Sequence, residues 1–126
     1  MTTTPQELAN VCRIVRKRAT DTWASGVKPR AGFLGAEDRG DGYYSPNEIG
    51  CCAWGAALVG MPIQWSLRNV TGAGPHFGEC DFRAGLMDGF DMREPTNWEK
   101  SDEYVAAYDL GRELRAEQKV RISDDE

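Results

Sequence analysis

The 126-residue sequence has a single histidine and no excess of basic residues. Fifteen Lys and Arg stand against twenty Asp and Glu, for a formal net charge of −5, and His76 is the one imidazole available as a base. Nucleic-acid affinity comes largely from Lys and Arg side chains that displace counterions from phosphates. The charge balance therefore argues against nucleic acid as the partner.

A targeting segment and a membrane span are also missing. Residues 1–10 are mostly polar and lack the basic-then-apolar order of a secretory signal. The uncharged stretch from Ile49 to Leu67 is long enough to raise the question of a span, but Gly60 and Pro62 interrupt it. We therefore expect a cytoplasmic protein with no membrane contact, in which this stretch is buried core.

Cofactor motifs are absent as well. No Gly-rich loop ends in Lys followed by Ser or Thr, and the glycines of residues 26–42 do not form a dinucleotide fingerprint. Without a secretory signal, the four cysteines are expected to be reduced thiols packed as small hydrophobic residues. They are Cys12, Cys51, Cys52 and Cys80. We expect no cofactor.

What the sequence does contain is one spacing that occurs twice in its last third. An aromatic residue is followed by small residues three and seven positions later, which places each triplet along one stripe of a helix. The triplets are Phe82, Gly85 and Gly89, then Tyr104, Ala107 and Gly111. Glycine in a helix interior costs roughly 0.5–1 kcal/mol relative to alanine, so we expect two helix backbones to touch there.

Three capping boxes predict helix starts at Thr4, Ser45 and Thr96. With the apolar spacing, they predict helices over 5–23, 46–59, 62–71 and 82–90, and from Asn97 or Ser101 to Val120. The expected fold is mainly α, a compact single domain over residues 1–122 with about five short helices and an acidic tail at 123–126. A long Gly-rich loop at 26–45 joins the first two helices and is a candidate binding loop.

Two catalytic or metal arrangements can be drawn on the sequence. Cys51 or Cys52 with His76 would give a cysteine-dependent enzyme, but Cys51 lies in the second turn of the expected helix, beyond the reach of its dipole. His76 and Cys80 are four residues apart, yet the paired spacing of a zinc site is missing among the cysteines. Packing is the favoured interpretation of these thiols, and we assign no catalytic residue and no metal.

Two family resemblances appear. Residues 5–58 resemble an uncharacterised class of small bacterial and phage proteins in which an N-terminal helix, a Trp before a Gly-rich loop and a Cys-Ala-x-Gly-Ala helix follow in order; here these are Trp23, Gly26 and residues 52–56. Residues 82–111, with Phe-x-x-Gly and Tyr-x-x-Ala-Tyr-x-x-Gly helices separated by Pro95, look like ribosome modulation factor and related small proteins. That resemblance implies a ribosome or RNA binder of basic character, whereas this segment is acidic.

The acidity lies in the C-terminal part, where residues 81–126 carry seven Lys or Arg and thirteen Asp or Glu. We expect a protein-binding module whose carboxylates steer it to a basic partner. The candidate partner-binding residues are Asp88, Asp91, Glu94, Glu99, Asp102, Glu103, Asp109 and Glu113. A phage or mobile-element accessory protein that inhibits a host defence or transcription factor, by occlusion or nucleic-acid mimicry, fits this interpretation.

Four alternatives stay open. The same carboxylates can be an ordinary solvated surface, and the basic residues Arg13, Arg16 and Lys17 of the first helix are also interpreted in that way. A ribosome binder and a cysteine enzyme are the other two functions. The glycine stripes can pack within one chain or between two copies, so a homo-oligomer is also open.

Overall fold

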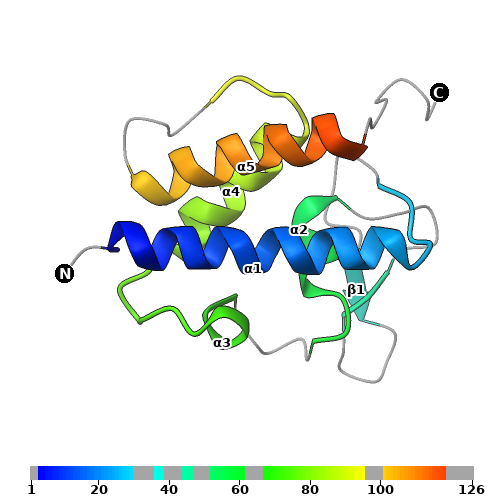
Figure 1. The fold of residues 1–126 in the computed structure, drawn as a ribbon, viewed down its shortest axis with the longest axis horizontal. Coiled ribbons are helices and arrows are strands. Elements are labelled where there is room, and N and C mark those ends of the chain that lie inside the picture. Colours follow the sequence, from blue (N-terminus) through cyan, green and yellow to red (C-terminus); the bar gives the residue numbers. More distant parts are fainter. Residues whose placement is uncertain are drawn as a thin grey trace.

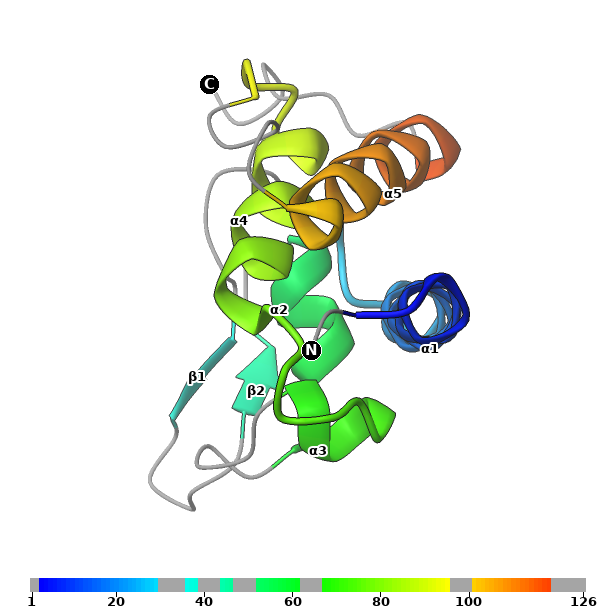
Figure 2. The ribbon, with the colours of Figure 1, turned by 90° about the vertical axis from the view of Figure 1, so that its left-hand side faces the viewer.

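The computed structural model describes residues 3–29, 36–38, 44–46, 52–61, 67–95 and 101–118, and this part of the chain is mainly helical. The elements in chain order are α1 (Pro5–Ala24), β1 (Ala36–Asp38), β2 (Tyr44–Pro46), α2 (Ala53–Leu58), α3 (Leu67–Thr71), α4 (Glu79–Phe90) and α5 (Asp102–Gln118). In Figure 1, α1 and α5 run side by side, with α4 against the inner side of α5. Figure 2 shows α2 in the middle, between α1 and α4.

Helix α1 begins and ends close to where the sequence predicts. Thr4 is the N-cap, its hydroxyl accepts a hydrogen bond from the Glu7 amide at 3.1 Å, and Pro5 opens the first turn. The buried residues recur every fourth position and form one stripe, since residues four apart lie on the same face of a helix. They are Val11, Val15, Ala19 and Trp23.

The predicted helix start at Pro46 is wrong. Tyr44–Pro46 is strand β2, and it pairs antiparallel with β1 in the register Ala36 opposite Pro46, Glu37 opposite Ser45 and Asp38 opposite Tyr44. Proline lacks a backbone amide, and within sheets it is found on edge strands such as this one. The sequence around Ser45 and Pro46 is compatible with a capping box and with an edge strand. Pairing with Ala36–Asp38 favours the strand.

Helix α2 starts at Ala53, after the N-cap Cys52, and is the centre of the fold. All six of its residues are buried, as expected for a helix without a polar face. The helix ends at Leu58 with Val59 as its C-cap, and Gly60 follows in a left-handed conformation with φ of +88°. Arg18 on α1 reaches over and donates to the Ala57 carbonyl at 2.5 Å and to the Val59 carbonyl at 3.3 Å, which satisfies acceptors at this helix end.

The two small-residue stripes do pack against each other, within one chain. A side-chain carbon at Gly85 or Gly89 would collide with the backbone carbonyl of Tyr104 or Tyr108 on α5. At Gly111 the same carbon would lie 2.5 Å from the Leu86 carbonyl oxygen. Helices α4 and α5 therefore touch backbone to backbone, and only glycine fits at these positions.

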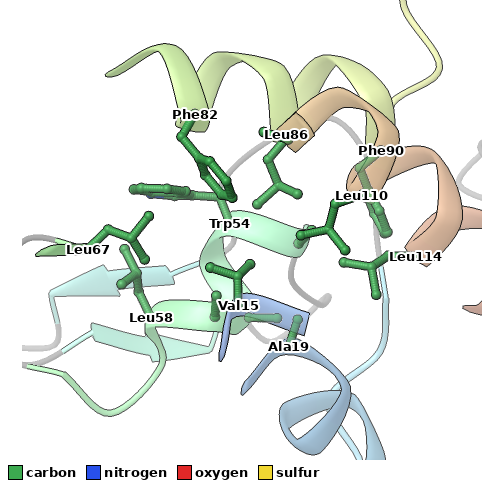
Figure 3. Close-up of a cluster of buried hydrophobic side chains, with 14 of the residues drawn as sticks. Val15, Ala19, Trp54, Leu58, Leu67, Phe82, Leu86, Phe90, Leu110 and Leu114 are labelled. Atoms are coloured by element: carbon green, nitrogen blue, oxygen red, sulfur yellow. The ribbon is translucent and has the colours of Figure 1, made fainter. Parts of the chain in front are cut away.

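The apolar core lies where the helices converge. Val15 and Ala19 of α1, Trp54 and Leu58 of α2, and Leu67 of α3 meet the residues of the α4–α5 pair (Figure 3). Those of the pair are Phe82, Leu86, Phe90, Leu110 and Leu114. Trp23, near the end of α1, stacks on Phe90 at 5.5 Å between ring centroids. One continuous core thus holds the described helices together.

Several expectations fall outside the described residues: the capping box at Thr96–Glu99, the start of a helix at Pro62, the acidic tail at 123–126 and most of the 26–45 loop. Helix α5 begins at Asp102, where the Ser101 hydroxyl accepts from the Tyr104 amide at 3.1 Å, so Ser101 rather than Asn97 precedes it. Over the part of the chain that is described, none of the helices has the length and apolar character needed to cross a membrane.

Candidate functional site

Four of the eight carboxylates selected from the sequence are exposed, and three of the four lie on α5. Glu94 follows α4, while Asp102, Asp109 and Glu113 are on the outer side of α5. Val105, between Asp102 and Asp109, is 40% exposed and is one of two large hydrophobic residues exposed in the described part of the chain. The outer side of α5 thus carries three carboxylates and the apolar Val105, with the exposed Arg112 seven residues after Val105. Glu99 lies outside the described residues.

Asp91 and Glu103 are corrections to the sequence-based set, because both are buried, at 8% and 9% exposure. The Glu103 carboxylate accepts hydrogen bonds from the Gly78 amide at 2.9 Å and the Thr3 hydroxyl at 2.5 Å. Burial raises the pKa of Glu103, but these two donors outweigh it and the pKa is lowered overall. This carboxylate links α5 to Gly78 and to Thr3 within the fold.

Asp91 ends α4. Its neighbour Met92 has φ of +61°, and the amides of Met92 and Arg93 bond back to the Gly89 and Asp88 carbonyls at 3.1 and 2.8 Å. This pair of bonds closes the helix end in the Schellman arrangement. Asp91 itself lies 3.5 Å from the Arg93 guanidinium.

Asp88 is partly buried and structural too. Its carboxylate accepts a hydrogen bond from the Tyr104 hydroxyl at 2.6 Å, which joins α4 to α5. Three of the eight selected carboxylates therefore act within the fold.

The single histidine is paired with a carboxylate and not with a thiol. Glu7 binds two groups of the loop before α4: one oxygen lies 2.8 Å from His76 Nε2, and the other accepts from the Gly74 amide at 2.8 Å. The Gly74 amide and the His76 side chain lower the pKa of Glu7. Glu7 and Glu103 together fasten the 74–78 loop to α1 and α5.

The three described cysteines differ in exposure and in their place in the fold. Cys52 is 1% exposed at the start of α2. Burial raises the pKa of Cys12 to about 11, so its thiol stays protonated at neutral pH. Cys80 is exposed on α4, Cys51 falls outside the described residues, and no group of three or more His, Cys, Asp or Glu within the described part is placed to hold a metal ion.

A groove of about 430 Å³ runs between α1 and α5. Its lining combines small and apolar residues with two charges of each sign: Ala9, Cys12, Arg13 and Arg16 from α1, and Ala106, Asp109, Leu110 and Glu113 from α5. Arg16 bridges the two helices, because its guanidinium contacts Glu113 and lies 2.6 Å from Glu117.

The sequence interpretation of Arg13, Arg16 and Lys17 as a solvated face missed this groove. Lys17 does stay on its own helix, 3.0 Å from Asp21. Arg16 instead reaches a helix about a hundred residues further along the chain. Periodicity shows that both residues are on a polar side, but it does not show what lies opposite.

Comparison of the chain with family models, with curated proteins and with solved structures gives no match in any of the three. Function is therefore inferred from the residues of this chain and from their geometry.

Proposed function

We propose that this protein is a small acidic helical module that binds a protein partner through the outer side of α5. The observation that carries the proposal is a stripe of three exposed residues, Asp102, Val105 and Asp109, spaced three and four apart. Residues at this spacing lie along one side of a helix. The stripe therefore offers an apolar contact between two carboxylates.

The chemistry of the stripe favours a basic partner. A net charge of −5 favours encounter with a positively charged surface, and exposed carboxylates then pair with its Lys and Arg. Carboxylates seven residues apart on a helix are separated by about 10 Å along its axis, which is close to three phosphate steps of one DNA strand. A groove built for phosphates would accept them, so we propose occlusion of a nucleic-acid-binding site as the mode of action.

Such a module suits a small accessory protein of a phage or mobile element, for example one that inhibits a host defence or transcription factor; its compact size and the resemblance of residues 5–58 to small bacterial and phage proteins support this setting. The proposal assigns no catalytic residue. The buried Cys52 thiol and the pairing of His76 with Glu7 support binding over cysteine catalysis.

The test uses the wild type and Asp102→Lys as baits to capture proteins from a lysate of the native host, at low and at high salt. We expect the wild type to enrich a basic nucleic-acid-binding protein at low salt. Asp102→Lys should not enrich it, because one carboxylate of the stripe is replaced by a positive charge. The purified partner should then bind its nucleic acid less tightly when the wild type is added.

The matched control is Asp21→Lys, which makes the same change in charge at an exposed position of α1. If Asp21→Lys loses the partner to the same extent as Asp102→Lys, the effect belongs to net charge and the stripe is not the contact. Capture of no basic protein at low salt would contradict the proposal as a whole.

A further inference from the structure

The groove between α1 and α5 has a mixed character, and it shares only Asp109 with the stripe of the proposed function. Half of its lining consists of small or apolar side chains, Ala9, Cys12, Ala106 and Leu110, which let another surface come close. In Figure 1 the two helices bordering it lie side by side, and in Figure 2 they stand at the side of the molecule away from β1 and β2.

The charges of the groove differ along its length. Toward the C-terminal ends of both helices, Arg16 is engaged by Glu113 and Glu117. One turn earlier, Arg13 donates to the Asn10 side chain at 2.7 Å on its own helix. Asp109 lies on the opposite wall, and within the described residues neither Arg13 nor Asp109 has an ion-pair partner.

A purely basic partner does not fit this groove, because it would meet Arg13 as well as Asp109. Arg16 and Glu113 of the lining pair with each other, which leaves Arg13 and Asp109, so the complement must also carry one charge of each sign. A two-fold axis supplies that complement without any other molecule, since in an isologous dimer residue i contacts j and j contacts i.

We propose that the α1–α5 groove is a self-association surface and that a second copy of this chain docks on it about a two-fold axis. Arg13 of each copy pairs with Asp109 of the other. The small residues of the groove pack across the axis, and the exposed Val105 on α5 adds apolar contact at the rim.

Sedimentation of the purified chain alone, over a range of concentrations at low salt, tests the proposal. We expect a dimer whose dissociation constant rises at least about tenfold with Arg13→Asp or with Asp109→Arg, because each places two like charges in contact in the dimer. The double variant Arg13→Asp/Asp109→Arg should return to within about threefold of the wild type, since it restores both pairs in reverse.

Matched controls separate the effect of the Arg13–Asp109 pair on dimerisation from the effect of net charge. Lys28→Asp and Glu94→Arg make changes of the same size at exposed positions away from the groove, and both should leave the dimer unchanged. Ala9→Gln fills the groove without adding charge and should weaken association. Circular dichroism of each variant confirms that the helices are retained.

A wild type that stays monomeric up to about 0.5 mM at low salt would overturn the inference, since association weaker than this leaves the groove without a self-binding role. A double variant as weak as the single ones would also overturn it, as would controls that weaken the dimer equally. No partner protein takes part in the measurement, so its failure leaves the proposed function standing, and failed capture from a lysate leaves this inference standing.

Discussion

Helix α5 packs against both α4 and α1, and it is held to these two helices in opposite ways. Against α4 the contact is backbone to backbone, with glycine at Gly85, Gly89 and Gly111 and no room for a side chain. Against α1 the two helices are spanned by the long side chain of Arg16, and a groove stays open between them. A closed contact can only stabilise the fold, whereas an open one leaves charged groups accessible for binding.

The attachment of α1 is polar at several points. Glu7 binds the 74–78 loop at one end, Arg16 binds α5 in the middle, and Arg18 and Thr22 donate to carbonyls of α2 further along. Its apolar stripe supplies the core contact beneath these bonds. The comparison therefore predicts large losses from changes at the α4–α5 contact and small, salt- or pH-dependent losses from changes on the α1 side.

The largest effect is expected from Gly111→Ala. The added carbon would lie 2.5 Å from the Leu86 carbonyl oxygen and 2.7 Å from the Phe90 amide nitrogen, so the two helices must separate. We expect the free energy of unfolding to fall by about 2–3 kcal/mol, as for overpacked cores, measured by urea denaturation. Ala116→Leu on the exposed side of α5 should change it by less than about 0.5 kcal/mol. Equal tolerance of both changes would mean that the backbones do not touch.

A smaller effect is expected from Arg16→Met, which removes the link to Glu113 and Glu117 and keeps an apolar stem. Because these side chains are partly exposed, we expect a loss of about 0.5–1 kcal/mol that shrinks as salt is added. Lys17→Met, which breaks an exposed pair within α1, should cost only about 0.3 kcal/mol. A loss as large as that of Gly111→Ala, and independent of salt, would erase the distinction between the two contacts.

The smallest effect concerns pH and Glu7. The pKa of Glu7 is lowered in the fold, so its stabilising contribution is complete above the ordinary value of 4.5 and is lost as the pH falls through the lower folded value. Removing this carboxylate with Glu7→Gln should therefore make the melting temperature fall less steeply between about pH 6 and pH 3. Glu94→Gln, at an exposed position, should keep the steeper dependence of the wild type. An unchanged slope in Glu7→Gln would show that the bonds to Gly74 and His76 do not stabilise the fold.

Much of the helical framework could be predicted from local patterns. The cap at Thr4, the stop at Gly60 and the stripes of α4 and α5 depend on residues a few positions apart, and the structure confirms each of them. The start of α2 could not be predicted in the same way, because Ser45 and Pro46 pair with β1 residues eight and ten positions earlier. Whether a capping box or a strand forms there depends on a partner that the local sequence does not contain.

The candidate site residues likewise include some that could be predicted from the sequence and some that could not. Asp102 and Asp109 are exposed as expected, but Asp91 and Glu103 have the same residue types in the same acidic region and are buried. The Glu103 position is decided by the Gly78 amide and the Thr3 hydroxyl, from segments 25 and 100 residues away. Charge patterning alone cannot separate a surface carboxylate from one that fastens the fold.

The sequence by itself determined that this chain is mainly helical, that it carries more acidic than basic residues, and that two helices must meet at their glycines. Those properties follow from side-chain spacing, capping chemistry and the space that a glycine leaves. Only the tertiary structure decided which carboxylates face solvent, that His76 pairs with Glu7, and that Arg13 and Asp109 stand on opposite walls of one groove. These depend on residues far apart in the chain, because burial and pairing are fixed by what the fold places opposite each side chain.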